Sequence, residues 1–320
     1  MKPLEPVALA DIQTARLRLA GTVMHTPLVR FNAPDVPAEI YLKLENLQPV
    51  GSFKIRAAGN AILSADNARL ANGVWTVSAG NMAHAVAWFA RKLGMACTAV
   101  VPEDAPATKL AALQRLQAKV IKVPFSDYQS IQRTHVFSGM PGQLIHPFAD
   151  PAVIAGDGTL GLEILEDLPD VDTILVPYGG GGLSCGIAPA VHAVNPRVKI
   201  CAVESASGAP LTASLAAGQP VEVPYTASFI SGIGAPFVFP EMWLLASQLL
   251  DGAFAVELAQ IAEAVRLQAE WNHVIAEGAG AVALAAALTG KAGGGKIVCL
   301  VSGGNIDSGK LVKILNGEVP

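Results

Sequence analysis

The sequence of 320 residues has few charged side chains, because Asp, Glu, Lys and Arg together make up only 15% of it. Apolar residues make up 52%, enough to bury a substantial core, and this composition excludes an intrinsically disordered chain. The formal net charge is −4 at pH 7. A weakly acidic chain has no general attraction to a phosphate backbone, so we expect no nucleic-acid partner.

Long hydrophobic runs are also missing. No run reaches the roughly 18 apolar residues that a membrane-spanning helix needs, so we expect no membrane partner. The longest candidate, residues 278–290, lies between Glu277 and Lys291 and predicts a buried helix. The N-terminal segment carries Glu5 and Asp11 where a signal peptide has an uninterrupted apolar core, so we expect a cytoplasmic protein.

Cysteine is scarce, with four residues in the whole chain: Cys97, Cys185, Cys201 and Cys299. Each stands alone in an apolar segment, and no two have the spacing of metal ligands. This pattern indicates reduced, buried thiols in a reducing compartment rather than a disulfide framework.

Short apolar runs alternate with longer segments of helical pattern, which is typical of βαβ units and a mainly parallel sheet. The predicted strands are residues 73–77, 96–101, 119–123, 173–178, 198–204 and 296–301. Predicted helices span about 53–72, ending at Gly73, and about 82–93, ending at Gly94. The fold class is therefore α/β, and the length suits about two domains or one large α/β unit.

Three of these strands lead directly into small residues, in the segments TVSAGN, LVPYGGGGL and CLVSGGN. In parallel sheets ligands bind beyond the carboxyl ends of the strands, where loops without bulky side chains let backbone N–H groups approach an anion. The four glycines from Gly179 to Gly182, followed by Leu183, suit a phosphate at the start of a helix, although a flexible turn is the simpler alternative. Three such strand ends in one chain predict a shared site.

Two familiar nucleotide-binding patterns do not fit. No G-x-G-x-x-G follows an early strand with an acidic residue suitably downstream, which argues against a dinucleotide site. Residues 304–310, GNIDSGK, match the spacing of a triphosphatase loop, but Leu311 stands where a Ser or Thr hydroxyl would bind Mg²⁺. The dinucleotide hypothesis is therefore weak, and we reject the triphosphatase.

A lysine stands at the start of an otherwise apolar helix, in the segment Gly51-Ser52-Phe53-Lys54. Lysines near helix starts are generally solvated. Partial burial at this position would lower the pKa of Lys54 and make its free amine available as a nucleophile or base.

The whole chain resembles the fold-type II pyridoxal-phosphate (PLP) enzymes, in the branch of the serine/threonine dehydratases and serine racemases. The similar segments, in the family's order, are TPL at 26–28, the block ending SFKIRAA, SAGN at 78–81, GDGTLGLEI at 156–164, PYGGGGL, and SGGN at 302–305. The resemblance implies the architecture of the tryptophan synthase β-subunit, with two doubly wound domains. Residues 1–70 plus 148–320 would form a large PLP-binding domain, and residues 71–147 a small inserted domain.

The resemblance also implies how the cofactor, PLP, is held. Lys54 would bind it covalently as a Schiff base, and Phe53 would pack beside its ring. The backbone of the glycine loop would bind the phosphate, through Gly179, Gly180, Gly181, Gly182 and Leu183. This agrees with the anion site expected from the glycines alone.

Three further residues are expected at the cofactor ring by resemblance. Asn81 would bind the ring hydroxyl, Ser302 would face the pyridine nitrogen, and Gly232 would permit a close approach to the cofactor. A neutral hydroxyl leaves the nitrogen largely unprotonated, which suits β-elimination better than transamination.

The substrate residues implied by the resemblance follow the strand 73–77, and they are Ser78, Ala79, Gly80, Asn81 and Met82. A carboxylate is favoured there because the loop precedes the N-terminus of a helix. Lys54 would remove the Cα proton of a 3-hydroxy amino acid, and loss of the hydroxyl would lead to a 2-oxo acid and ammonia.

Three departures from the family pattern bear on the expected reaction, substrate and metal. Ala79 stands where racemases of this branch have a second serine, which favours dehydration over racemisation. Met82 replaces the usual histidine, which would enlarge the pocket for a bulkier substrate such as 3-phenylserine. Glu204 matches one ligand of a structural cation, but Pro210 replaces the expected carboxylate, so we predict no metal.

The predicted function is a PLP-dependent dehydratase acting on threonine, serine or a bulkier 3-hydroxy amino acid. A racemase or a β-replacement enzyme of the same fold is the first alternative, and a catalytically silent PLP carrier or amino-acid sensor is the second. The expected partners are a small amino-acid substrate and, by resemblance only, a second copy of the chain in a homodimer.

Overall fold

Two separate sheets organise the computed structural model, which describes residues 4–320. The larger sheet has the strand order β1-β2-β10-β7-β8-β9. Its strands are β1 (Leu28–Arg30), β2 (Glu39–Leu44), β7 (Thr173–Pro177), β8 (Lys199–Ser205), β9 (Gly252–Val256) and β10 (Lys296–Val301). All neighbouring pairs are parallel except the edge strand β1, which runs antiparallel to β2.

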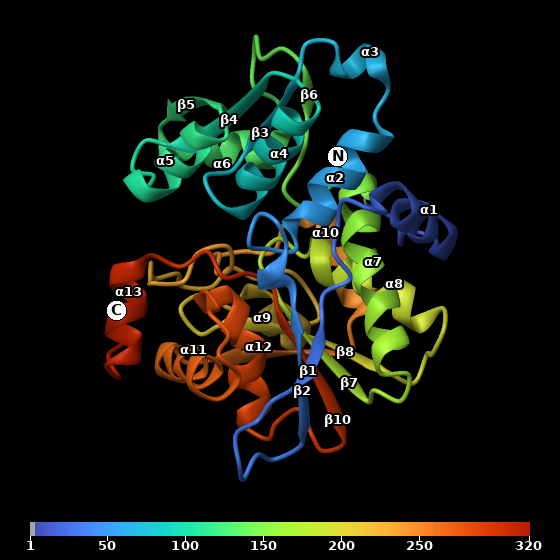
Figure 1. Ribbon diagram of the computed structural model, residues 1–320, viewed down its shortest axis with the longest axis vertical. Helices are drawn as coiled ribbons and strands as arrows, with labels where there is room; N and C mark the ends of the chain where they lie inside the picture. Colours follow the sequence, from blue (N-terminus) through green and yellow to red (C-terminus); the bar gives the residue numbers. More distant parts are fainter. Residues whose placement is uncertain (1–3) are drawn as a thin grey trace.

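The smaller sheet is entirely parallel and has the order β5-β4-β3-β6. Its strands are β3 (Val74–Val77), β4 (Cys97–Pro102), β5 (Lys119–Val123) and β6 (Gln143–Leu144). Figure 1 shows this sheet in the upper part of the molecule, with the larger sheet below it. Every residue of β3 is buried, as expected for a strand covered on both faces.

Helices cover both faces of the larger sheet. One apolar core lies under α1 (Leu9–Leu19), α7 (Pro151–Asp167), α8 (Gly182–His192) and α10 (Pro240–Leu249). A second core, on the other face, lies under α11 (Leu258–Asn272), α12 (Gly278–Leu288) and α13 (Ser308–Leu315). Two short helices follow strands of this sheet, η1 (Glu45–Leu47) after β2 and α9 (Pro210–Ala217) after β8.

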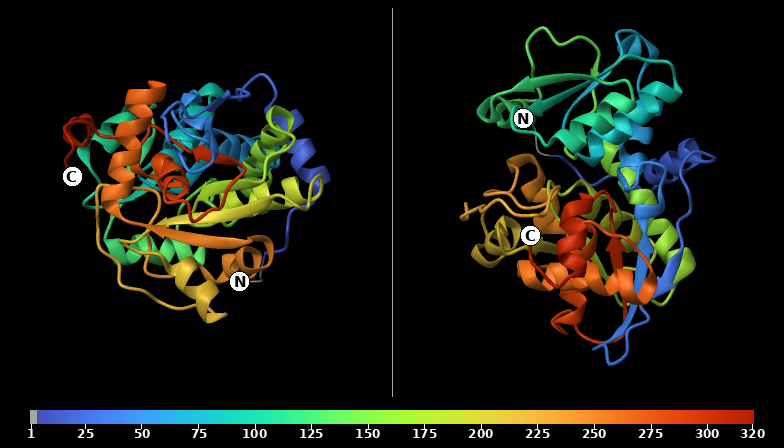
Figure 2. Two further views of the ribbon diagram at one scale, coloured as in Figure 1. Left: turned by 90° about the horizontal axis from the view of Figure 1, so that it is seen from below. Right: turned by 60° about the vertical axis from the view of Figure 1, so that its left-hand side comes forward.

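The smaller sheet is covered in the same way. On one side lie α2 (Lys54–Ser64), α4 (Asn81–Lys92) and α5 (Ala107–Arg115), and on the other lies α6 (Phe125–Thr134). A single-turn helix, α3 (Asn67–Leu70), precedes β3. The right-hand view of Figure 2 shows the two sheets with their helices as distinct upper and lower parts, and Figure 1 shows α2 at their junction. The α/β class and the two doubly wound units are thus confirmed, while the exact domain boundaries, 1–70 plus 148–320 and 71–147, stay a prediction.

Several local expectations are also met. The segment predicted as a buried helix, residues 278–290, contains α12, which ends at Leu288. Gly290 follows in a left-handed conformation with φ 73°. All four cysteines are free and buried. Within residues 4–320, no helix has both the length and the apolarity needed to cross a membrane.

Candidate active site

Lys54 is held against the end of the central strand β10. The N–H of Phe53 donates to the carbonyl oxygen of Ser302 over 3.0 Å, and Ser52 pairs with Gly303 in an isolated antiparallel bridge. Because Lys54 is the first residue of α2, these contacts fix the start of the helix at the carboxyl edge of the larger sheet.

The amine of Lys54 is partly buried among protein groups. Its Nζ donates to the carbonyl oxygen of Pro147 over 2.5 Å and lies 4.7 Å from the centroid of the Phe53 ring. Burial lowers the pKa of Lys54, and the carboxylate of Asp157 opposes that shift. A lowered pKa increases the fraction of neutral amine, which is the form able to act as nucleophile or base.

The turn that carries Pro147 is fixed by His146, which is buried. Its Nδ1 accepts from the N–H of Ala149 over 2.8 Å, and its Nε2 lies 3.1 Å from the carbonyl oxygen of Gln132. Nδ1 therefore carries no proton and Nε2–H donates. Burial lowers the pKa of His146 to about 3, so the ring stays neutral and keeps both bonds at physiological pH.

The glycine loop joins β7 to α8 and has no room for side chains. A Cβ on Gly180 would lie 2.1 Å from the Phe148 ring, and one on Gly179 would lie 2.4 Å from the carbonyl oxygen of Gly232. Gly181 has φ 91° and precedes α8, whose N-terminus receives no side-chain cap in the described chain. The N–H groups at this helix start, including that of Leu183, suit a phosphate.

Asn81 connects the two sheets. It begins α4, and its Nδ2 donates to Oε1 of Glu277 over 2.6 Å while its Oδ1 accepts from Asn305 over 2.8 Å. A Cβ on Gly303 would lie 3.2 Å from Asn81 Nδ2. These contacts link Asn81, Ser302, Phe53, Lys54 and the glycine loop through three intervening residues. Gly303 lies beside Asn81 and follows Ser302, and Pro147 and Phe148 connect Lys54 to Gly180.

The loop between β3 and α4 leaves a helix start open. The Oγ of Ser78 accepts from the N–H of Gly80 over 3.2 Å, Ala79 packs on the core below, and no side chain caps α4. Around Gly80, the position of a Cβ has no atom within 4 Å. Met82 differs, because its side chain is 2% exposed and packs in the core between α2 and α4, which favours a packing role.

Ser302 is buried at the end of β10. Its hydroxyl donates a long hydrogen bond of 3.3 Å to the carbonyl oxygen of Ala279, and both hydroxyl lone pairs remain available. Glu277 lies beside this strand end, and burial raises its pKa to about 7. A carboxyl group that titrates near neutrality thus contacts Asn81 directly.

Arg56 lies two residues after Lys54 and forms the ion pairs expected of a buried arginine. Its guanidinium donates to Glu45 from Nε and Nη2 over 2.8 Å and to Glu163 from Nη1 over 2.6 Å. All three side chains are buried. This network ties α2 to η1 and α7, and so supports the helix that begins with Lys54.

Both carboxylate oxygens of Glu204 accept hydrogen bonds from the start of α9. Its Oε1 accepts from the N–H of Leu211 over 3.0 Å, and its Oε2 accepts from both the N–H and the hydroxyl of Thr212 over 2.7 Å. The carboxylate therefore caps α9, which begins at Pro210. Burial raises the pKa of Glu204, and the bonds from Thr212 and Leu211 oppose the shift. This donor set does not fit a cation site.

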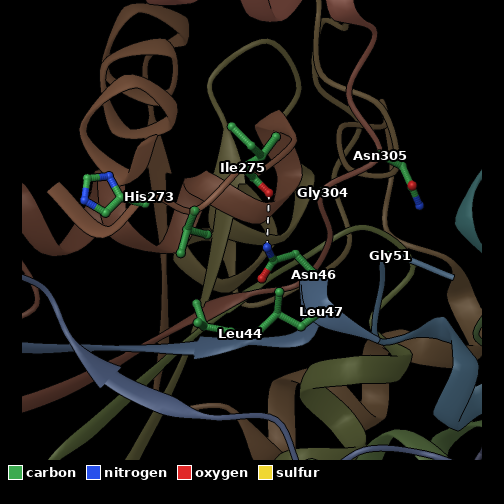
Figure 3. Close-up of a pocket in the computed structure, with 9 residues that line it drawn as sticks. Leu44, Asn46, Leu47, Gly51, His273, Ile275, Gly304 and Asn305 are labelled. Atoms are coloured by element: carbon green, nitrogen blue, oxygen red, sulfur yellow. Dashed lines mark hydrogen bonds between the residues drawn. The ribbon is translucent and has the colours of Figure 1, made fainter. Parts of the chain in front are cut away.

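A cavity of about 540 Å³ lies beside Asn305, at the carboxyl edge of the larger sheet (Figure 3). Asn305, which binds Asn81, forms part of its wall, and Asn46 spans it by donating to the carbonyl oxygen of Ile275 over 3.2 Å. The full lining is Leu44, Asn46, Leu47, Gly51, His273, Val274, Ile275, Gly304 and Asn305.

The residues at the sheet edge fit PLP. An amine of lowered pKa at Lys54 suits its aldehyde, and the uncapped start of α8, with no space for side chains at Gly180, suits its phosphate. Together with the two parallel sheets, this arrangement defines a PLP-dependent enzyme of fold-type II.

Comparisons with known proteins agree, and the chain belongs to the family described as "Pyridoxal-phosphate dependent enzyme", whose model matches residues 19–303. It is 38% identical to L-threonine ammonia-lyase of Thermotoga maritima, over 97% of this chain and 78% of that protein. It is 37% identical to the catabolic L-threonine dehydratase of Escherichia coli, over 97% and 96% of the two chains. The structure of maize serine racemase superposes with a TM-score of 0.86 at 33% identity, covering 98% of each chain.

Sequence reasoning did not find the carbonyl of Pro147, the contact of Glu277 with Asn81, or the carboxylate of Asp157 near Lys54. Asp157 had a visible signal, since it is an acidic residue inside the mostly apolar first half of a helix. A backbone carbonyl such as that of Pro147 leaves no signal in side-chain identity.

Proposed function

We propose that this protein is a dehydratase that removes water from a 3-hydroxy amino acid such as threonine or serine, releasing a 2-oxo acid and ammonia. The observation that carries the proposal is the continuous set of contacts from Asn81 to Lys54 and the glycine loop, which gathers a carboxylate site, an amine and a phosphate site. Two relatives whose names assign them to L-threonine support it, and this chain covers 78% and 96% of their lengths.

Lys54 binds the cofactor and is the base. When bound, PLP withdraws electrons from the Cα of the attached amino acid and so acidifies its proton. The amine of Lys54 would take that proton, and Phe53 would pack beside the cofactor ring. The N–H groups of the loop bind the phosphate, from Gly179, Gly180, Gly181, Gly182 and Leu183.

Asn81 and Ser302 orient the ring. One hydrogen of Asn81 Nδ2 is used by Glu277, and the second is free for the ring hydroxyl. The hydroxyl of Ser302, whose bond to Ala279 is long, would donate to the pyridine nitrogen of the cofactor, and Gly232 would leave space beside it. The substrate carboxylate binds at the open start of α4, at Ser78, Ala79 and Gly80.

The choice of substrate within this class is also a proposal. Threonine and serine are favoured, and 3-phenylserine is included because nothing lies within 4 Å of a Cβ position at Gly80. Met82 contributes its backbone at the helix start, since its side chain packs in the core.

The two competing reactions, dehydration and racemisation, differ in their need for a second proton donor. Racemisation needs a proton donor on the face opposite Lys54, and Ala79 has no hydroxyl, which favours elimination. The likeness to a serine racemase keeps that reaction as the second candidate. A β-replacement enzyme and a silent PLP carrier remain the other candidates, and we further propose a homodimer located in the cytoplasm.

The test is an assay of 2-oxo acid and ammonia with purified, PLP-loaded protein and serine, threonine, 3-hydroxyaspartate and 3-phenylserine, with chiral analysis of the remaining amino acid. We expect release of oxo acid from at least threonine or serine. Lys54→Ala should abolish it, while Lys92→Ala, an exposed lysine of α4, should not. Racemisation without oxo acid would replace the dehydratase proposal with a racemase.

A further inference from the structure

Asp157 is a buried carboxylate whose oxygens have no partner. It lies in the middle of α7, its side chain has no exposed surface, and neither Oδ1 nor Oδ2 accepts a hydrogen bond from any described residue. Burial of an unpaired carboxylate is unfavourable, and such groups are rare in folded proteins. This residue therefore calls for a functional explanation.

The packing of α7 on α2 brings Asp157 to the start of the helix that carries Lys54. The two helices approach so closely at Gly156 that a Cβ there would lie 2.4 Å from the carbonyl oxygen of Arg56. Asp157 is the next residue along α7. The charged groups whose fields act on it are Lys54 and Arg56 of α2 and Glu45 of η1.

Arg56 is not available as its partner. The guanidinium is already bonded to Glu45 and Glu163, to the hydroxyl of Thr159 and to the carbonyl oxygen of Met24. Glu45 repels a second carboxylate.

Lys54 is different, because among the described residues its amine bonds only to the neutral carbonyl oxygen of Pro147. Of the cations that act on Asp157, Lys54 alone has no carboxylate of its own.

We propose that Asp157 is a positioning residue for Lys54, its buried carboxylate serving as the counter-charge that stabilises the ammonium form of the Lys54 amine once that amine has taken up a proton. The pairing acts through space, since no ion pair within 4.0 Å joins the two side chains in residues 4–320. Each group opposes the effect of burial on the other. Burial raises the pKa of Asp157 to about 7, and the charge of Lys54 lowers it.

This role concerns the proton that Lys54 removes from the Cα of the substrate. After Lys54 takes the Cα proton, its amine is a cation in a poorly solvated site, and Asp157 stabilises that charge without a competing hydrogen bond. Asp157 has this role only if Lys54 is the amine that binds PLP, as proposed above. Its effect on the proton affinity of Lys54, however, exists whatever the substrate is.

The experiment therefore measures the amine directly. Cofactor-free full-length protein is labelled with acetic anhydride over a range of pH, and the acetylation of Lys54 is quantified by peptide mass spectrometry. Asp157→Asn keeps the size of the side chain and removes its charge. Glu166→Gln makes the same change on the exposed side of α7 and serves as the control.

We expect the midpoint of Lys54 labelling to move at least one pH unit lower in Asp157→Asn, which is about a tenfold gain in labelling below the midpoint. The control should match the wild type. Asp157→Ser, which removes the charge with a smaller side chain, should give the same shift if Asp157→Asn folds poorly. An unchanged midpoint in a folded variant, by circular dichroism, would overturn the proposal.

A second readout separates this inference from the proposed activity. In the PLP-loaded protein, the acidic limb of the pH profile for oxo-acid release should shift in the same direction, whereas a merely structural defect would lower activity equally at every pH. A labelling shift in a protein with no oxo-acid release would uphold the role of Asp157 and reject the dehydratase.

Discussion

The amine of Lys54 donates a hydrogen bond to the carbonyl oxygen of Pro147, 2.5 Å away. These residues are far apart in sequence, and the bond joins the start of α2 to the turn that precedes α7. The neighbouring Phe148 ring covers Gly180 in the glycine loop. One turn therefore contacts both the amine and the phosphate site, so its geometry matters for both.

His146 should be required for that geometry. His146→Ala removes the bonds to Ala149 and Gln132 and leaves their buried groups unpaired, so the free energy of unfolding should fall by about 1–3 kcal/mol. The dissociation constant of PLP should rise as well. Urea unfolding and a fluorescence titration with PLP measure the two effects. His192→Ala, at the far end of α8, where the ring contacts the carbonyl oxygen of Val198 and the carboxylate of Asp251, should leave PLP binding unchanged.

The buried network around Arg56 should dominate the stability of α2. Arg56→Met leaves Glu45 buried without a cation and Glu163 with Lys43 alone, and the free energy of unfolding should fall by about 3–5 kcal/mol. Arg16→Met breaks an exposed pair with Glu166 and should cost less than about 1 kcal/mol. Equal losses in urea unfolding would show that the Arg56 network is not the stabilising element.

Glu277 should make stability depend on pH. Burial raises its pKa from 4.5 to about 7, so the folded protein binds this proton more tightly than the unfolded chain does. The stabilisation is complete below about pH 4.5 and is lost as the pH rises to about 7.

Glu277→Gln keeps an acceptor for Asn81 and removes this titration. Relative to the wild type, the variant should gain up to about 3 kcal/mol between those two pH values. Denaturant unfolding at several pH values measures the difference, with the exposed Glu222→Gln as the control. A constant difference across this range would contradict the assignment.

The sequence predicted much of the fold because buried parallel strands are continuous apolar runs. Residues 296–301 coincide with β10 and residues 173–178 contain β7, and both strands are buried. Residues 119–123 coincide with β5, a partly exposed edge strand whose run contains two lysines. It missed β2, whose apolar pattern is interrupted by Lys43, because that lysine is neutralised only by contacts made in the folded state, with Asp167 and the carbonyl oxygen of Thr26. The edge strands β1, β6 and β9 were missed too.

One predicted helix is in fact two, and the prediction over 53–72 was wrong in this respect. The chain leaves α2 at Ala65, in an extended conformation, and Asp66 caps α3 by accepting from the N–H of Ala68. Asp66 lies inside the helical pattern, and an Asp at such a place is itself a signal of a helix N-cap. Distances between the strand ends, such as those that bring Glu277 to Asn81, depend on tertiary packing and have no local signature.

Glu204 should act as a helix cap and not as a cation ligand. Addition of Mg²⁺ or Ca²⁺, or of a chelator, should leave the melting temperature unchanged, because Leu211 and Thr212 already occupy both carboxylate oxygens. Thr212→Val should lower the free energy of unfolding by about 1 kcal/mol through loss of one hydrogen bond. A rise in melting temperature with Ca²⁺ that disappears in Glu204→Gln would establish a cation site.

Gly180 and Phe148 should be coupled. A Cβ at Gly180 would lie 2.1 Å from the Phe148 ring, so Gly180→Ala must displace the ring and should cost about 1–3 kcal/mol of unfolding free energy and weaken PLP binding. The clash disappears when the ring is removed, so the same substitution should cost much less in a Phe148→Ala background. A double-mutant cycle by urea unfolding measures this coupling, which should be about 1 kcal/mol or more. Equal costs in both backgrounds would mean that the loop needs glycine for its backbone conformation and not for the space beneath Phe148.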